Sequence, residues 1–325
     1  MDIRVVSALL VLPALACGSE THRSTPVAEL THQTQAGASA AAGAPADSAG
    51  TTGDDSSSDE ITFRTEQVSV AAGEERFLCF AQDVDQDAAI DGYVHEAQSF
   101  VHHVVLARTL AREPDGLSEC DVLFRTTWDP LFITGAGRSE LDFPNGLGHK
   151  LTKGTQVLAQ LHLLNAGESD VTDTVEIKMH RSSASDPTPV GTYVFGTTNL
   201  RLPAGQKARA VGSCRLQEDV QIIDAFPHMH RLGRALQFEA GSSADNMQSL
   251  FVRDPYDFDD QHAVGVGIQL HAGDLTRVTC DYDNTTDHDV TFGESTNAEM
   301  CFFVGFAVGQ SDLRTCLPSN KPPML

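Results

Sequence analysis

The stretch that says most about fold and chemistry is residues 226–234, which read Phe226-Pro227-His228-Met229-His230-Arg231-Leu232-Gly233-Arg234. On a β-strand, residues two apart point to the same face, so His228 and His230 are expected side by side. Two imidazoles on one face can chelate a metal ion. Pro227 suits an edge strand or a strand end, where a metal would be accessible. A solvent-facing pair of histidines is the alternative interpretation.

Short apolar stretches recur on both sides of this segment, from Ile61 onward, and Gly, Pro, Asn and Asp separate them. These stretches are residues 100–107, 156–164, 175–179, 221–225, 275–280 and 301–308. Long helical periodicity is absent, and many short strands with turn residues between them are typical of β-sandwiches. Residues 182–189 are polar and contain proline, which predicts a domain junction there. The sequence therefore predicts an all-β chain.

Two further histidine motifs lie upstream. His102 and His103 are adjacent, and successive residues on an ideal strand face opposite ways. Both can reach one ion only if the strand bulges or twists, or if the rings use different nitrogens. Otherwise one is a ligand and the other packs. His162 follows Gln160 by two residues, so a strand would place them on one face, where the glutamine could bond a ligand or water. A structural strand histidine is the alternative for His162.

Downstream lies Glu299-Met300-Cys301. The thioether of Met300 is a soft ligand, and soft sulfur with imidazoles favours copper over zinc or iron. The alternative is that Met300 fills space in the core, as methionine commonly does.

The ordered set of His-His, Gln-x-His, His-Met-His and Glu-Met-Cys resembles the copper type II, ascorbate-dependent monooxygenases, from about Glu75 to Cys316. The resemblance implies two consecutive antiparallel, jelly-roll-like β-sandwich domains with one copper each. The ligands that it implies are His102, His103 and His162 for an electron-storing copper, and His228, His230 and Met300 for the copper that binds dioxygen and substrate.

The resemblance also implies a reaction: hydroxylation of a C–H bond of a small organic substrate, with O2 and ascorbate or a similar one-electron donor. The electrons would cross a cleft between the domains. Phe226, Phe302 and Val304 stand where peptide-hydroxylating members have Arg, Asn and Tyr. The polar side chains that contact a peptide carboxylate in those members are therefore missing here. A more apolar or aromatic substrate is expected. The alternatives are a non-catalytic copper-binding or storage lipoprotein on the same scaffold, and a metal-free adhesion sandwich.

Six cysteines follow Cys17: Cys79, Cys120, Cys214, Cys280, Cys301 and Cys316. An even number in an exported chain suggests three disulfides, although the residues alone leave the connectivity open. The family resemblance implies that Cys280 pairs with Cys301 and Cys214 with Cys316, which leaves Cys79 for Cys120.

The N-terminus reads as an export signal. Residues 5–16 are apolar, too short to span a bilayer, and precede Cys17 as in a bacterial lipoprotein cleavage site. We expect a signal peptide over residues 1–17, lipidation of Cys17, and a membrane anchor in the bacterial cell envelope, in the periplasm or on the outer surface. Residues 18–60 are rich in Ser, Thr, Ala and Gly, which predicts a disordered tether. Domains are predicted over residues 61–185 and 186–325.

The chain is acidic, with 22 Lys and Arg against 45 Asp and Glu and a formal charge of −23. Such a surface repels phosphate backbones, so the sequence predicts no binding to nucleic acid. It leaves the oligomeric state open. The remaining downstream histidines are predicted to be surface or structural residues: His95, His149, His180, His262, His271 and His288.

Overall fold

The structure is a computed structural model that describes residues 59–120, 125 and 127–318. The predicted signal peptide, Cys17 and all but the end of the predicted tether lie outside the described residues. The described chain is all-β, as predicted, and contains no helix that could cross a membrane.

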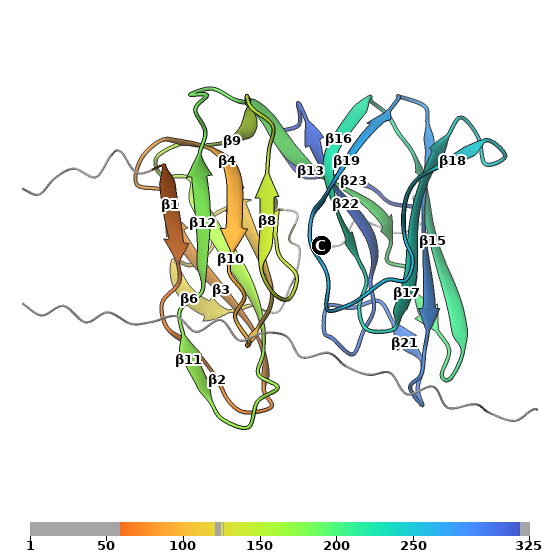
Figure 1. The fold of residues 1–325 in the computed structure, drawn as a ribbon, viewed down its shortest axis with the longest axis horizontal. Coiled ribbons are helices and arrows are strands. Elements are labelled where there is room, and N and C mark those ends of the chain that lie inside the picture. The colour runs from red at the N-terminus through yellow and green to blue at the C-terminus, as the bar shows by residue number, and fades with distance from the viewer. Residues whose placement is uncertain (1–58, 121–124, 126, 319–325) are drawn as a thin grey trace, which may run out of the picture. The chain divides into compact units, whose positions relative to one another are not determined.

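The strands before residue 182 are coloured orange to green in Figure 1. They are β1 (Glu60–Arg64), β2 (Val68–Val70), β3 (Glu75–Asp83), β4 (Ala88–His95), β5 (Val101–Thr109), β6 (Gly116–Glu119), β7 (Trp128–Ile133), β8 (Ser139–Asp142), β9 (Leu147–Leu151), β10 (Gln156–Leu164), β11 (Val171–Asp173) and β12 (Glu176–Arg181).

The strands after that point are coloured green to blue. They are β13 (Thr188–Thr197), β14 (Arg201–Leu202), β15 (Lys207–Arg215), β16 (Val220–His228), β17 (Gly233–Gly241), β18 (Met247–Arg253), β19 (Val264–Leu270), β20 (Leu275–Asp283), β21 (Val290–Thr291), β22 (Cys301–Val308) and β23 (Arg314–Cys316).

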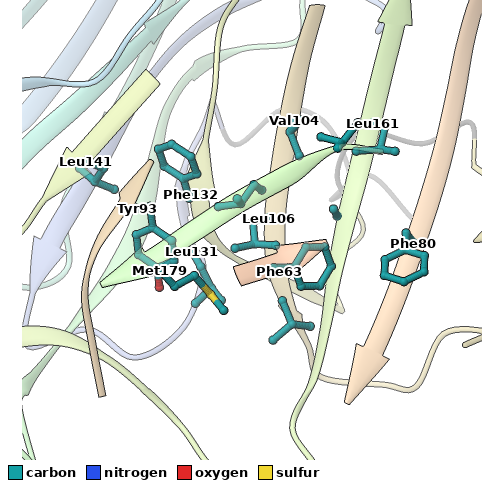
Figure 2. Close-up of a cluster of buried hydrophobic side chains, with 14 of the residues drawn as sticks. Phe63, Phe80, Tyr93, Val104, Leu106, Leu131, Phe132, Leu141, Leu161 and Met179 are labelled. Atoms are coloured by element: carbon teal, nitrogen blue, oxygen red, sulfur yellow. The ribbon is translucent and has the colours of Figure 1, made fainter. Parts of the chain in front are cut away.

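The first half is a sandwich of two sheets. One sheet has the order β6-β3-β10-β5-β7, and the other contains β1-β12-β4-β9 with β8 on β4. Apolar side chains from both sheets form one buried cluster, because alternate residues of each strand point inward. Figure 2 shows part of this core: Phe63, Tyr93 and Met179 from one sheet, and Phe80, Val104, Leu106 and Leu161 from the other.

The second half repeats this plan. One sheet contains β13-β22-β16-β19 with β23 on β13, and the other has the order β15-β20-β17-β18. Burial along β20 alternates at every residue, as expected of a strand with one face on the core. Phe195 and Phe303 from the first sheet pack with Phe238 from the second, and the rings of Phe238 and Phe303 stack at 4.3 Å.

The two halves are joined through the strands next to the predicted junction. β13 begins at Thr188 and pairs in parallel with β9 at two positions, so the sheets of the two halves are continuous. The described residues all belong to one compact unit. The division at residue 185 therefore stays a prediction.

Three disulfides are present among the described residues. Cys79 is bonded to Cys120, Cys214 to Cys316, and Cys280 to Cys301, which confirms all three predicted pairs. The last bond connects β20 to the first residue of β22, directly after Met300.

Candidate metal centre

The upstream histidines lie on two paired strands of the first sandwich. His162 on β10 is directly opposite His103 on β5, and the register slips by one residue beyond this pair, so that Leu163 faces Val101. His102 is the extra residue of a β-bulge. A bulge turns consecutive side chains toward one side, which confirms the first of the two geometries that would let adjacent histidines converge.

One nitrogen from each of His102, His103 and His162 lies within 4.8 Å of the others. The His103 Nδ1 atom is 3.2 Å from the His102 Nδ1 and 3.2 Å from the His162 Nδ1. The Nε2 atoms of His102 and His103 are buried and have no hydrogen-bond partner among the described residues. Because the His103 Nδ1 is close to the other two Nδ1 atoms, the three Nδ1 atoms converge on one point. We call these three residues the N-terminal set.

Burial keeps the rings of the N-terminal set neutral. It lowers the pKa of His102 to about 3 and that of His103 well below its usual value. Burial also lowers the pKa of His162, against the raising effect of its hydrogen bond to Glu75. Neutral imidazole is the form that binds a metal. The His162 Nε2–H donates to Glu75 Oε1 at 2.7 Å, so the Nδ1 atom of His162 carries the free lone pair.

His228 and His230 form the core of a second set. His228 is the last residue of β16, whereas His230 lies beyond the strand, so the expectation that both are strand residues is wrong for His230. The chain turns there, and the two ring centroids are still 5.1 Å apart. Pro227 lies near the strand end, as predicted, but His230 is only 3% exposed, so the expected accessibility is not observed.

Each ring of this pair is oriented by a hydrogen bond from Nδ1. The His228 Nδ1–H donates to Gln261 Oε1 at 2.7 Å, and the His230 Nδ1–H donates to the carbonyl of Ala298 at 3.0 Å. The Gln261 Nε2 in turn donates to the Phe258 carbonyl, which fixes the amide orientation. Both Nε2 atoms keep a lone pair, and that of His228 is buried without a partner among the described residues. Burial lowers the pKa of His228 to about 3 and of His230 to about 4.

The side chain of Glu299 holds the backbone of Met300 next to that of His230. The Glu299 Oε2 accepts the backbone N–H of His230 at 2.9 Å and that of Met300 at 3.3 Å, while Oε1 accepts the Leu232 N–H at 2.6 Å. The Tyr282 hydroxyl donates to the Met300 carbonyl at 2.6 Å. Burial raises the pKa of Glu299 to about 7, although the three N–H donors oppose it. We call His228, His230 and Met300 the C-terminal set.

The two sets adjoin each other. The ring centroids of His103 and His228 are 6.2 Å apart, and the Phe258 ring lies 4.8 Å from His102 and 6.4 Å from His230. The cleft that the family resemblance implied is therefore not observed between these rings. An edge-to-face contact takes its place.

The positions that depart from peptide-hydroxylating enzymes gather around Met300. Phe226, Phe302 and Val304 belong to one buried apolar cluster with Met300, which also contains Val194 and, from the first sandwich, Val105 and Ile133. Met300 is 1% exposed. The surroundings of the thioether are thus apolar and come from both halves of the chain.

Sequence reasoning missed the residues that orient the ligands. Glu75 and Gln261 are far from their histidine partners along the chain, and nothing in their local sequence points to them. Glu299 did carry a signal, because a carboxylate directly before a buried strand needs a partner. The structural or surface role predicted for the other histidines agrees with the structure: His95 and His149 are buried, and the remaining four are not.

The donor sets fit copper. The N-terminal set offers three neutral imidazoles at one point. The C-terminal set offers two imidazoles and the thioether of Met300, whose backbone Glu299 holds next to that of His230. Such nitrogen and sulfur donors suit Cu(II) and Cu(I). Orphaned buried nitrogens such as His228 Nε2 are costly unless a ligand satisfies them. The donor types of both sets are therefore ones that copper takes, and the histidines of the N-terminal set lie close enough together to hold one ion.

Comparisons with known proteins agree. Residues 189–325 match the sequence profile of the copper type II ascorbate-dependent monooxygenase, C-terminal domain. The human "Putative DBH-like monooxygenase protein 2" is 24% identical over 252 residues, which cover 69% of this chain and 50% of that protein. The chain thus spans about half the length of this curated relative.

Solved structures add nothing to this. An allantoicase structure matches 61% of this chain and 74% of its own at 11% identity, with a TM-score of 0.18. A fucolectin from striped bass serum matches 74% and 86% at 9% identity, with a TM-score of 0.20. Such scores carry no argument about fold or function. Residues 189–325 are thus similar to the C-terminal domain of the copper type II ascorbate-dependent monooxygenases, and the human relative supports a relationship of the chain to that family.

Proposed function

We propose that this chain is a copper-dependent monooxygenase that hydroxylates a C–H bond of a small organic substrate. The balanced reaction is R–H + O2 + 2 e⁻ + 2 H⁺ → R–OH + H2O, with ascorbate or a similar one-electron donor as the source of electrons. The observation that carries the proposal is the pairing of two unlike donor sets. One offers three Nδ1 atoms, and the other offers two Nε2 atoms and a methionine whose backbone N–H shares the Glu299 carboxylate with that of His230.

Copper bound at both sets would supply the redox chemistry, taking electrons from the donor and activating O2. His228 and His230 would hold the ion of the C-terminal set through Nε2, because Gln261 and the Ala298 carbonyl occupy their Nδ1 protons. The Met300 thioether favours Cu(I), the form that reacts with O2.

The N-terminal set would hold the electron-storing copper through its Nδ1 atoms. Contact between His103 and His228, at 6.2 Å between centroids, supports electron transfer over a short path. The buried apolar side chains of Val105, Ile133 and Phe226 keep water away from the neighbourhood of Met300. Exclusion of water protects reactive intermediates from side reactions.

We propose an apolar or aromatic substrate. Phe226, Phe302 and Val304 belong to the same buried apolar cluster as Met300 and offer no partner for a carboxylate. Because Met300 is 1% exposed, a substrate must displace some of these side chains to approach the C-terminal set.

A copper-binding protein without turnover is the second candidate, and the close burial of Met300 is the observation that favours it.

The test uses copper-loaded full-length protein, ascorbate, ¹⁸O2 and a panel of apolar and aromatic compounds, with mass spectrometry for the gain of one labelled oxygen. The proposal predicts labelled product from the parent and none from Met300→Ile. A matched control, Met247→Ile on β18, should leave product formation unchanged. Copper binding without product from any compound would favour the non-catalytic protein.

We also propose export to the bacterial cell envelope with a lipid anchor on Cys17. The three disulfides support an oxidising compartment. Cys17→Ser should release the protein from the membrane fraction and leave copper content unchanged. A variant that stays with the membrane after a high-salt wash would refute the anchor.

A further inference from the structure

Glu75, the first residue of β3, lies beside the N-terminal set. Phe77 on β3 is directly opposite His162 on β10, and the two rings stack at 4.3 Å. Glu75 is two residues before Phe77, so it lies on the same face of the sheet as a diagonal neighbour of His162. The sheet register, rather than a loop, therefore brings the carboxylate to the imidazole.

The same carboxylate oxygen is held from the second half of the chain. Glu75 Oε1 accepts the His162 Nε2–H at 2.7 Å, and it also accepts the Thr296 backbone N–H at 3.3 Å and hydroxyl at 3.2 Å. The His162 side chain is 1% exposed and that of Glu75 is 24% exposed. Donors on both sides thus restrict the rotamers of Glu75.

We propose that Glu75 is a positioning residue for the N-terminal copper, which orients His162 and makes its Nδ1 atom a stronger donor. This inference rests on the copper-binding part of the proposed function and not on hydroxylation. A carboxylate that accepts one ring N–H fixes the tautomer in which the other nitrogen carries the lone pair. It also raises the basicity of the ring, which stabilises Cu(II) relative to Cu(I).

The contact between Glu75 and Thr296 also connects the N-terminal set to the C-terminal set. It lies four residues before Met300, in the segment that also supplies the Ala298 carbonyl to His230. Glu75 therefore touches a ligand of the N-terminal set and the segment that orients the C-terminal set. Thr296→Val removes only the hydroxyl contact, because the backbone N–H remains.

The first measurement needs no metal. In the apo full-length protein with ¹⁵N-labelled histidine, the nitrogen chemical shifts of His162 report its tautomer. We expect the Nε2–H form in the parent and in Glu75→Gln, whose side-chain oxygen still accepts the proton. Glu75→Ala should show a mixture of the two tautomers. A pure Nε2–H form in Glu75→Ala would overturn the proposal.

The second measurement uses copper. The full-length chain carries His228→Gln and His230→Gln, so that the titration reports the N-terminal set. Glu75→Ala should weaken copper affinity by about 10- to 100-fold, the usual effect of losing such a partner. Glu75→Gln should weaken it less and raise the reduction potential, because the negative charge that favours Cu(II) is gone. Melting temperature confirms that each variant is folded.

Two controls separate positioning from packing. Glu119→Gln, at an exposed carboxylate on neighbouring β6 that pairs with Arg76, should match the parent in affinity and potential. Thr296→Val should have a smaller effect than Glu75→Ala. An effect of Thr296→Val as large as that of Glu75→Ala would contradict the proposal, as would an unchanged potential in Glu75→Gln. Parent protein that binds copper with the expected Glu75 effects but never hydroxylates would refute only the proposed function.

Discussion

The N-terminal and C-terminal sets present their imidazoles by opposite means. In the N-terminal set, two paired strands and one bulge bring three Nδ1 atoms together, so the ligands are positioned by the sheet itself. In the C-terminal set, only His228 lies on a strand, and the other two ligands follow or precede strands. There a carboxylate, an amide and a disulfide hold the ligands in place. The comparison indicates that the C-terminal set depends more on local partners and less on the sheet.

Removing a ligand from one set should produce the largest difference in copper content between the two sets. His162→Ala should remove the copper of the N-terminal set and leave that of the C-terminal set, because the two share no ligand. Elemental analysis of copper per chain in the parent and the variant measures this. His288→Ala, at an exposed histidine, is the control. Loss of both coppers in His162→Ala would show that the sets are not independent.

Glu299→Gln should damage the C-terminal set selectively. The side-chain NH2 group of glutamine would face a backbone N–H of Leu232 or His230, where the carboxylate now accepts hydrogen bonds. A buried unsatisfied donor costs about 1–3 kcal/mol. Chemical denaturation should show a loss of this size, and copper content should fall at the C-terminal set alone. An equal loss of copper from the N-terminal set would contradict the comparison.

The disulfide next to Met300 should matter more to the C-terminal set than the other disulfide in that half. Replacing both Cys280 and Cys301 by serine should cost about 2–5 kcal/mol and weaken copper binding at the C-terminal set. The double replacement of Cys214 and Cys316 should cost a similar stability without that loss of copper. Denaturation and copper titration of the two variants decide this. Equal copper affinities would show that the bond does not position Met300.

Much of the fold followed from the pattern of the chain. The predicted strands at residues 156–164 and 301–308 have the observed bounds, because each is a continuous apolar run between turn residues. The proximity of His102, His103 and His162, and that of His228 and His230, also followed from local motifs, whereas their role as copper ligands stays a prediction. For residues one or two apart in sequence, strand geometry alone predicts whether their side chains point to the same face of a sheet.

The rest depends on contacts between distant segments. Glu75 reaches His162 across a gap of 87 residues, and Gln261 reaches His228 through the fold of a loop. The position of His230 beyond the strand depends on the turn at residues 231–232, which the two-residue spacing does not reveal. The contact between His103 and His228 arises from the packing of two sandwiches. No local pattern specifies such an interface.

A buried histidine outside both sets should affect only stability, and neither copper set. Burial lowers the pKa of His149 to about 3, below the ordinary value of 6.5. A folded-state pKa below the unfolded one stabilises the protein above pH 6.5, and this contribution is lost as the pH falls toward 3. Apo protein should lose at most about 1.4 kcal/mol per pH unit from this group. His149→Gln should make the dependence of unfolding free energy on pH shallower. An unchanged slope would contradict this.

X-ray absorption spectroscopy of the copper-loaded, ascorbate-reduced protein tests the central claim most directly. Two unlike donor sets predict nitrogen scattering at both coppers and a sulfur contribution from one of them. The sulfur contribution should disappear in Met300→Ile and persist in Met247→Ile, while the nitrogen scattering of the N-terminal set is retained in both. A parent spectrum without sulfur, or a sulfur contribution that survives in Met300→Ile, would contradict the assignment of Met300 as a ligand.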